Sequence, residues 1–450
     1  MNTEQFIKVL FARALESGIT ECEAYCTSGE GFSVDVLDGA IKEYAVSGSD
    51  GLCLRGLYKG SMGYASTEVM DEDAIELLID GVKSSAELIE SDDNETLFEG
   101  SASYPEVKTG TKESADLPAS EKIRLSIALE EKVKALDPRV KRVEGCGFES
   151  VSSTLRIVNT KGLDLSSSKA LIGAYVAPIV IEDGKTNFSF DMKFSGSKAD
   201  IDLDKMAAKA VNEAVAGLGA SSIPSGEYRC VLRYDTAATL LSTFAGVFSG
   251  ESARKGMSLL KGKEGTDIAS PVVTLIDDPL LEGGFATRAF DCEGVASSTH
   301  NIIENGRLVT LLHNRTTARL LGCETTGNAA KAGFTGKVQV APSNFFIKPS
   351  ATAFDELISA VGNGIMITSL MGMHSGANGI TGDFSLGAKG YMIENGRLGK
   401  PIEQITIAAN FFDVLKQIRA VADDLTFARP GSSSIGCPTI DIGLIKVAGL

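Results

Sequence analysis

Apolar residues recur every three to four positions in several segments of this chain, which is the spacing of an amphipathic helix. In the first half this spacing predicts helices at residues 3–17, from 71 or 72 onward, at 119–136 and at about 202–218. In the second half it predicts short helices at about 236–248, 315–321 and 411–420. The segments between the helices show strand-like patterns, so the chain is predicted to have an α+β fold.

Between the first two helices, residues 21–67 are interrupted by glycine, serine and aspartate, which is typical of strands joined by turns. We expect five short strands in an antiparallel meander, with the sequences ECEAYCTS, GFSVDVLDG, AIKEYAVSGS, GLCLRGLYKG and SMGYAST. More strands follow through 139–195, where Glu182-Asp183-Gly184-Lys185 predicts a hairpin turn. Residues 90–103 are polar and acidic and predict a surface loop.

A chain of 450 residues is too long for one ordinary core and predicts two domains. Residues 221–226 (Ser-Ser-Ile-Pro-Ser-Gly) have the composition of a linker, so we place the boundary there. We expect an N-terminal α+β domain at 1–220, made of an antiparallel sheet with helices on one face. We expect a β-rich, partly barrel-like domain at 221–450 that carries the helix at 236–248.

One short sequence occurs twice in the second half. Ile-Glu-Asn-Gly-Arg-Leu is found at 303–308 and again at 393–398. Asn-Gly between apolar runs is a strong hairpin signal, because both turn residues can adopt positive φ. The repeat therefore predicts two similar hairpins, and it hints at an internal duplication within a β-rich domain.

The chain is acidic, with 43 Lys and Arg against 59 Asp and Glu and a formal charge of -16. Because DNA affinity depends on Lys and Arg that displace counterions, we expect no direct binding of nucleic acid. The N-terminus has no apolar signal-peptide segment, and no run approaches the length of a membrane span. Eight cysteines occur without a CxxC pair. We therefore expect a soluble cytoplasmic protein with reduced thiols and no membrane contact.

Candidate chemistry is sparse. The three histidines, His300, His313 and His374, are too far apart in sequence to form a zinc motif on one helix. We expect His300 and His313 to be structural, whereas the glycine-flanked His374 is the most site-like because it lies on a predicted exposed loop. No nucleophile elbow, P-loop or dinucleotide fingerprint occurs. The residues alone indicate a two-domain α+β protein without an assigned reaction.

A series of motifs in the second half changes this interpretation. In order, they are Arg254-Lys255-Gly256, Val273–Asp278, Phe290–Val295, Ile303–Leu308, Ala318–Gly322, Thr326–Ala329, Thr381–Ser385, Gly390–Gly396, Pro401-Ile402, Ile405–Asn410 and Val447–Leu450. This collinear set covers about the last 220 residues and resembles the TldD/PmbA family (peptidase U62), once described as modulators of DNA gyrase. The first half resembles the N-terminal domain of the family mainly in its pattern.

The resemblance places the chain in the PmbA/TldE branch of the family. TldD-like members hold a metal with a His-Glu-x-x-x-His helix and a late cysteine. Here the first histidine position falls on Leu241 or Ser242, the glutamate on Ser242 or Thr243, and the second histidine on Gly246 or Val247. None of these residues is a metal ligand, so no catalytic residue, metal or cofactor is expected in this chain. Cys437 lies in the region of the family cysteine, and its role stays open.

The resemblance implies a non-catalytic subunit of a heterodimeric metallopeptidase that processes or degrades unfolded peptides. Zinc would be held by a TldD-like partner subunit, although self-pairing into a homodimer is also open. An extended peptide could add as a strand to a β-rich wall with glycine-rich loops. The segments 326–334 and 372–382 are our candidates for such a groove, with the peptide-binding residues Gly327, Asn328, His374, Ser375, Thr381, Gly382 and Asp383.

Two other functions stay open, and with them the question of whether the chain is an enzyme. The chain could itself be a metallopeptidase with an unrecognised site built from its scattered histidines and abundant carboxylates. It could instead be a peptide-binding regulator linked to DNA gyrase or to toxin–antitoxin control, without hydrolysis. The acidic charge indicates that any effect on gyrase is indirect.

Overall fold

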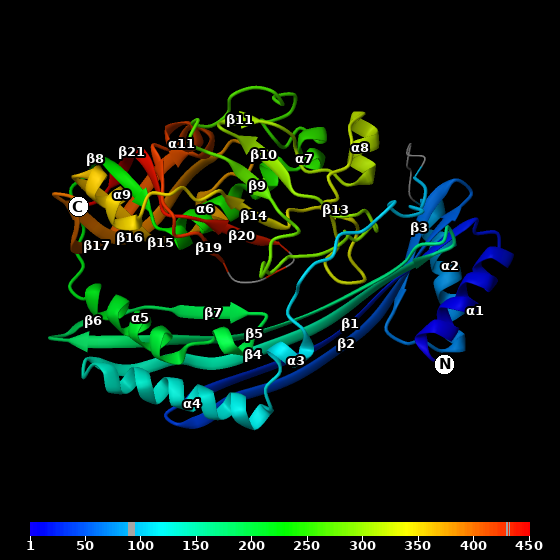
Figure 1. Cartoon of the computed structure of the whole chain (residues 1–450), viewed down its shortest axis with the longest axis horizontal. Helices are drawn as coiled ribbons and strands as arrows, with labels where there is room; N and C mark the ends of the chain where they lie inside the picture. The colour runs from blue at the N-terminus through cyan, green and yellow to red at the C-terminus, as the bar shows by residue number, and fades with distance from the viewer. Residues whose placement is uncertain (89–94, 429–430, 432) are drawn as a thin grey trace.

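A long, curved antiparallel sheet forms the base of the molecule, and a β-rich domain lies above it in the view of Figure 1. The computed structural model describes residues 1–88, 95–428, 431 and 433–450. The predicted acidic loop at 90–103 therefore lies partly outside the described residues. The mixture of helix and strand confirms the predicted α+β class.

The N-terminal sheet has the strand order β3-β2-β1-β4-β5-β6, and β7 also pairs with β5. Its strands are β1 (Glu21–Leu37), β2 (Ala40–Tyr58), β3 (Ser61–Thr67), β4 (Val140–Asn159), β5 (Asp164–Glu182), β6 (Lys185–Phe188) and β7 (Asp191–Ser195). The predicted hairpin turn after β5 is confirmed, since Asp183 and Gly184 both have positive φ. Four of these strands are much longer than an average strand, so they span most of the molecule.

The prediction of five short strands in residues 21–67 is wrong, because the two long strands β1 and β2 and the shorter β3 occupy this segment. β1 and β2 pair continuously through the predicted turns, with Gly29 opposite Ser49 and Gly31 opposite Ser47. Neither glycine has positive φ. A Cβ at Gly31 would lie 2.6 Å from the Ser47 hydroxyl oxygen, so this glycine permits a close approach inside a strand.

Gly51 on β2 provides a test of this use of glycine. A Cβ at this position would collide with the ring of Phe334, which belongs to the C-terminal domain. We expect Gly51→Val to lower the free energy of unfolding by about 1–3 kcal/mol, because overpacking a fixed contact displaces the ring. Gly48→Ala on the same strand is the matched control, since its Cβ meets nothing nearer than 4.0 Å. Thermal melting of both variants checks the prediction, and equal melting temperatures would contradict it.

The helices of the N-terminal half pack on one face of the sheet, as predicted (Figure 1). The helices α1 (Thr3–Glu16) and α2 (Glu72–Leu88) cover one end of the sheet, where they pack on Cys22, Ala24 and Leu54. The helices α4 (Ala119–Leu136) and α5 (Leu203–Ala216) cover the other end, where they pack on Val34 and Phe148. This half also contains the short helix α3 (Lys112–Ala115) and a 3₁₀ turn at Lys198–Asp200.

The C-terminal domain contains a closed five-stranded barrel. Its strands follow the order β17-β16-β15-β8-β21, and β21 pairs back to β17. They are β8 (Gly226–Leu232), β15 (Gly364–Met371), β16 (Asp383–Glu394), β17 (Arg397–Asn410) and β21 (Ile440–Ala448), with β18 (Ala420–Val421) beside β21. The barrel interior merges with the largest apolar core of the chain, to which Phe244, Phe248 and Phe411 contribute.

A second sheet in this domain has the order β11-β10-β9-β14-β20-β19. Its strands are β9 (Leu275–Asp277), β10 (His300–Glu304), β11 (Arg307–Leu308), β14 (Asn344–Ile347), β19 (Thr426–Phe427) and β20 (Ser434–Cys437), and β12 (Ala329–Ala330) pairs separately with β13 (Gln339–Val340). Helices fill the connections: α6 (Tyr234–Phe244) with its 3₁₀ extension Ala245–Phe248, α7 (Gly250–Arg254), α8 (Arg315–Leu321), α9 (Phe354–Val361), α10 (Met373–Gly376) and α11 (Phe411–Gln417). None of the helices in the described ranges combines the length and apolarity that crossing a membrane requires.

Both copies of the repeated sequence form the predicted hairpins. The turn residues Asn305-Gly306 and Asn395-Gly396 all have positive φ, and Glu pairs with Arg across each turn. The two hairpins belong to different sheets, because one joins β10 to β11 and the other joins β16 to β17 in the barrel.

A buried ion cluster connects the N-terminal sheet to the C-terminal domain. Arg55 of β2 is only 4% exposed, and its guanidinium lies 2.9 Å from Glu23 and 3.2 Å from Glu95. Glu293 of the C-terminal domain lies 4.0 Å from the same guanidinium and accepts a hydrogen bond from the backbone N–H of Arg315. One cation therefore compensates three carboxylates at the contact between the two halves.

Candidate functional site

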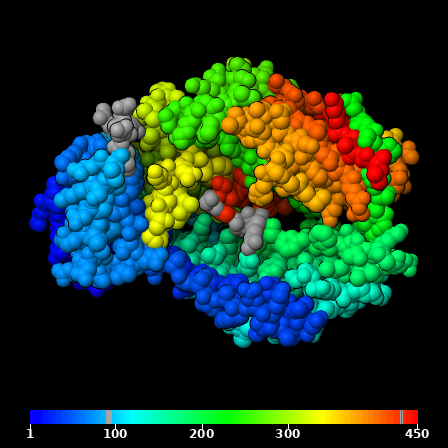
Figure 2. All heavy atoms as spheres, turned by 180° about the vertical axis from the view of Figure 1, so that it is seen from behind, coloured from blue at the N-terminus to red at the C-terminus, as the bar shows by residue number. Residues whose placement is uncertain are grey.

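A cleft lies between the edge of the N-terminal sheet and the C-terminal domain, where the surface is hollowed in Figure 2. A cavity of about 600 Å³ is lined by residues 108–110 and 114, 192–197, 282–285 and 425–428, together with Asp200. A second cavity of about 480 Å³ is lined by 186–190 and by residues of the barrel, among them Thr368, Lys389 and Tyr391. Both cavities lie along the β6–β7 edge, and together they are called the interdomain cleft below.

The strand β7 forms one wall of the interdomain cleft. Within the part of the chain that the structure describes, β7 pairs only with β5. Its residues from Met192 to Ser195 line the larger cavity. An edge strand carries backbone N–H and C=O groups without a strand partner, and an extended peptide can pair with them.

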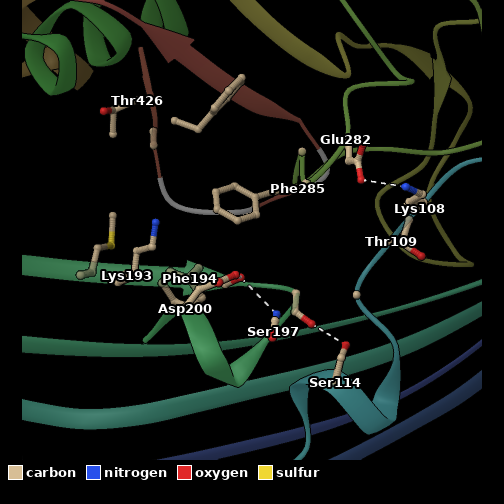
Figure 3. Close-up of a pocket in the computed structure, with 18 of the residues that line it drawn as sticks. Lys108, Thr109, Ser114, Lys193, Phe194, Ser197, Asp200, Glu282, Phe285 and Thr426 are labelled. Carbon is tan, nitrogen blue, oxygen red and sulfur yellow. Dashed lines mark hydrogen bonds and ion pairs between the residues drawn. The ribbon is translucent and has the colours of Figure 1, made fainter. Parts of the chain in front are cut away.

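Short contacts hold the floor of the larger cavity in place (Figure 3). The Ser114 hydroxyl donates to the carbonyl oxygen of Gly196 at 2.6 Å, and the Ser195 hydroxyl donates to the Asp200 carboxylate. Lys108 pairs with Glu282 at 3.1 Å, which joins the N-terminal segment to the C-terminal domain. Both side chains of that pair are largely exposed, so it stabilises the closure only weakly.

The smaller cavity contains a second set of charged groups, among them Glu213, Arg233, Asp235 and Lys389. Arg233 bonds to Asp235 through two nitrogens and to Glu213 at 3.0 Å. Burial lowers the pKa of Lys389, whose ammonium lies 4.5 Å from the centre of the Phe188 ring. The residues that line the two cavities include no histidine or cysteine. The lining offers charged and hydrogen-bonding groups that can bind a ligand.

Helix α6, to which the resemblance assigns the metal-binding motif of the family, contacts the lining of both cavities. Its Asp235 lines the smaller cavity, and α6 packs on β19, whose Thr426 and Phe427 line the larger one. Ser242 and Gly246 are exposed one turn apart, whereas Leu241 and Val247 are buried in the core.

The family metal does not fit this helix. Zinc requires imidazole, thiolate or carboxylate ligands, and neither alignment of the motif supplies one at the histidine positions. Thr243, the other candidate for the glutamate position, donates its hydroxyl to the backbone oxygen of Thr239. Across residues 1–88, 95–428, 431 and 433–450, no three His, Cys, Asp or Glu side chains gather as a metal site would.

Five of the predicted peptide-binding residues lie between positions 374 and 383 of the chain. His374 and Ser375 are exposed on α10, Thr381 and Gly382 lie in the turn before β16, and Asp383 is the first residue of that strand. The Asp383 carboxylate accepts from the Asn410 amide at 2.9 Å and the Thr381 hydroxyl at 2.8 Å, and these bonds lower its pKa. None of the five lines the two cavities. Their contact with a peptide stays a prediction.

Gly327 and Asn328 lie in the interior of the C-terminal domain. The Asn328 amide donates to Asp277 at 2.7 Å and to the Ala341 carbonyl oxygen at 3.2 Å, and its oxygen accepts from Thr326. Asn328 is 1% exposed, so its polar groups are engaged within the fold and cannot line an open groove. The glycine at 327 has positive φ and serves the turn.

The remaining residues that the sequence singled out are structural in their surroundings. His313 is buried beside Thr317, and burial lowers its pKa. His300 lies 2.9 Å from the Ser298 hydroxyl, and its pKa is also lowered by burial. Cys437 is completely buried on β20, where burial raises the pKa of its thiol.

Sequence reasoning missed the segments that form the interdomain cleft. They are separated by up to several hundred positions, and each is unremarkable alone. The glycine-rich turns Ser195-Gly196-Ser197 and Glu282-Gly283-Gly284-Phe285 are the signal that could have indicated a close approach of two chain segments.

Three family models match consecutive parts of the chain. The PmbA/TldA metallopeptidase domain 1 model matches residues 22–86, the central domain model matches 112–218, and the C-terminal domain model matches 225–449. Among curated relatives, the "Metalloprotease PmbA homolog" of Haemophilus influenzae is 28% identical, covering 89% of this chain and 86% of the relative. The "Metalloprotease TldD homolog" of the same organism is 27% identical, covering 92% of this chain and 89% of the relative.

Solved structures show the same fold. A candidate modulator of a DNA gyrase from Thermotoga maritima has a TM-score of 0.91 and 31% identity, covering 99% of this chain and all of that one. TldE from Thermococcus kodakarensis has a TM-score of 0.89, covering 99% of this chain and all of that one. Its identity is 20%, so this second likeness concerns the fold alone.

Proposed function

The chain belongs to the PmbA/TldD metallopeptidase family, and from this premise we propose that it is the non-catalytic, TldE/PmbA-like subunit of a heterodimeric metallopeptidase acting on unfolded peptides. The observation that carries the proposal is the chemistry of α6. Where the family motif has two imidazoles and a carboxylate, this helix has serine, threonine, glycine and apolar side chains. Zinc and the water that it activates then belong to a TldD-like partner.

The role assigned to this chain is to hold the peptide. The β7 edge supports it, because main-chain pairing binds extended chains with little regard to their sequence. The two cavities follow the β6–β7 edge, and α6 contributes Asp235 to the lining of one of them, so a peptide on β7 would run close to the helix assigned to the family motif. All eight cysteines are unpaired, which supports the cytoplasm as the place of action.

The test mixes the purified chain with a TldD-like subunit from the same genome and measures hydrolysis of an unfolded peptide. We expect hydrolysis only in the mixture, and we expect a chelator to abolish it, because the metal is on the partner. Thr426→Trp, an exposed residue of the interdomain cleft, should lower the rate of the mixture by roughly tenfold by obstructing the cleft.

Thr335→Trp is the matched control, since Thr335 is exposed on the same domain and does not line either cavity. Hydrolysis by this chain alone would replace the proposal with an autonomous metallopeptidase. Tight peptide binding by this chain, with no hydrolysis in any mixture, would favour a peptide-binding regulator.

A further inference from the structure

The helix layer over the N-terminal sheet has a gap in its middle. The pair α1 and α2 covers one end and the pair α4 and α5 covers the other. Between them lies a groove with a volume of about 490 Å³, called the Lys122 groove after the one lysine buried in it. It is lined by Glu30, Gly31, Phe32, Val46, Ser47, Gly48, Lys112, Ala115, Asp116, Lys122, Ser150, Val151, Ser152, Ala170 and Leu171.

Lys122 lies in the first turn of α4, yet it is only 4% exposed. Its ammonium donates to the Ser150 hydroxyl at 2.7 Å and lies 4.5 Å from the centre of the Phe32 ring. The nearest carboxylate oxygen, on Asp116, is 4.0 Å away, and the Asp116 side chain is 60% exposed. The buried ammonium therefore has one hydrogen bond and a distant, solvated counter-ion.

An ammonium has three N–H groups, and its burial is costly unless a charge and hydrogen bonds compensate it. At Lys122 that compensation is incomplete, and burial lowers its pKa. The other lysine of the groove, Lys112, is neutralised by Glu30 at 2.6 Å on the exposed rim. A carboxylate entering the groove would supply the missing acceptor directly at Lys122.

The rest of the groove is suited to an apolar body. Phe32 and Val46, which face each other across β1 and β2, line it with aromatic and aliphatic side chains, and Val46 is 67% exposed. A Cβ at Gly48 would meet nothing nearer than 4.0 Å, so the glycine leaves open space. The volume lies within the range of small-molecule sites, which combine apolar walls with a few polar groups.

We propose that the Lys122 groove binds a small carboxylic acid with an aliphatic or aromatic body, the carboxylate on Lys122 and the body along Phe32 and Val46. The site is distinct from the interdomain cleft, because the short helix α3 separates them. Ser114 of α3 lines the cleft, whereas Ala115 lines the groove. The proposal is independent of the function proposed above.

The test is a calorimetric titration of the full chain with octanoate and, separately, with octanol at neutral pH. We expect octanoate to bind roughly tenfold or more tightly than octanol, because the charge-assisted hydrogen bond requires the carboxylate. Lys122→Met keeps the side-chain length and should weaken octanoate by roughly tenfold or more. Lys42→Met is the matched control, since Lys42 is exposed on β2 and does not line the groove.

Gly48→Leu is a second variant that leaves Lys122 in place. Its side chain fills the open space, so octanoate binding should be lost while the melting temperature stays near that of the unchanged chain. Equal affinity for octanoate in Lys122→Met, or equal affinity for octanol and octanoate, would overturn the proposal. So would the absence of octanoate binding up to about 1 mM.

Discussion

Replacing Arg55 with methionine should lower the free energy of unfolding by about 3–5 kcal/mol at neutral pH. The guanidinium is buried where the N-terminal sheet meets the C-terminal domain, with Glu23 at 2.9 Å and Glu95 at 3.2 Å. Methionine fills much of the space but leaves these carboxylates and Glu293 without their shared cation. The loss comes mainly from the uncompensated buried charges rather than from the missing contacts.

Thermal melting and urea unfolding of Arg55→Met would measure the effect. Arg13→Met is the matched control, because Arg13 also pairs with two carboxylates, Glu72 and Glu76, but at the surface. Exposed pairs of this kind contribute about 0–1 kcal/mol. Similar losses in the two variants would mean that water reaches the Arg55 cluster, contrary to its burial.

Glu293→Gln should make the protein more stable above pH 7, by roughly 3 kcal/mol, and leave it unchanged near pH 4.5. Burial, with the neighbouring Asp291 charge, raises the pKa of Glu293 to about 7. In the unfolded chain a glutamate titrates near 4.3. The folded state therefore holds more protons between these values, so the stability of the unchanged protein falls as pH rises through this window.

Glutamine removes this pH dependence while its amide oxygen can still accept from the Arg315 backbone N–H. Melting temperatures measured between about pH 4.5 and 8 should diverge progressively for the two proteins. Glu282→Gln is the control, because Glu282 is largely exposed and its removal should leave the pH profile unchanged. Parallel profiles for Glu293→Gln and the unchanged protein would contradict the prediction.

Local signals were sufficient for most of the longer helices, whereas α9 (Phe354–Val361) and the short α3, α7 and α10 were not predicted. The prediction of 119–136 coincides with α4, and that of 315–321 coincides with α8, because apolar spacing is a property of neighbouring residues. Both Asn-Gly hairpins were predictable for the same reason. The strands β1 and β2 were not, since glycines at 29, 31 and 51 imitate turns. Their actual role depends on partners across the sheet and, at Gly51, on Phe334 from the other domain.

The candidate site was less predictable than the fold. The mismatch between α6 and the family motif is visible in the sequence, because it concerns residue types at a fixed spacing, and the expected absence of a metal stays a prediction. The interdomain cleft could not, because it combines segments near 110, 195, 284 and 427 that meet only after folding. Asn328 shows the opposite error. The segment 326–334 was predicted to line a peptide groove, whereas the Asn328 amide satisfies the buried Asp277.

The barrel has a consequence for the order of events during synthesis. Its first strand, β8, pairs with β15 and with β21, and β21 also closes the barrel onto β17. Until the ribosome has released residues 440–448, β8 lacks one neighbour and the barrel has an open seam. The N-terminal sheet and its helices depend on no strand beyond β7, so they can form much earlier. A nascent chain therefore carries a finished sheet beside an unfinished barrel, in which the edge of β8 that later pairs with β21 is still open.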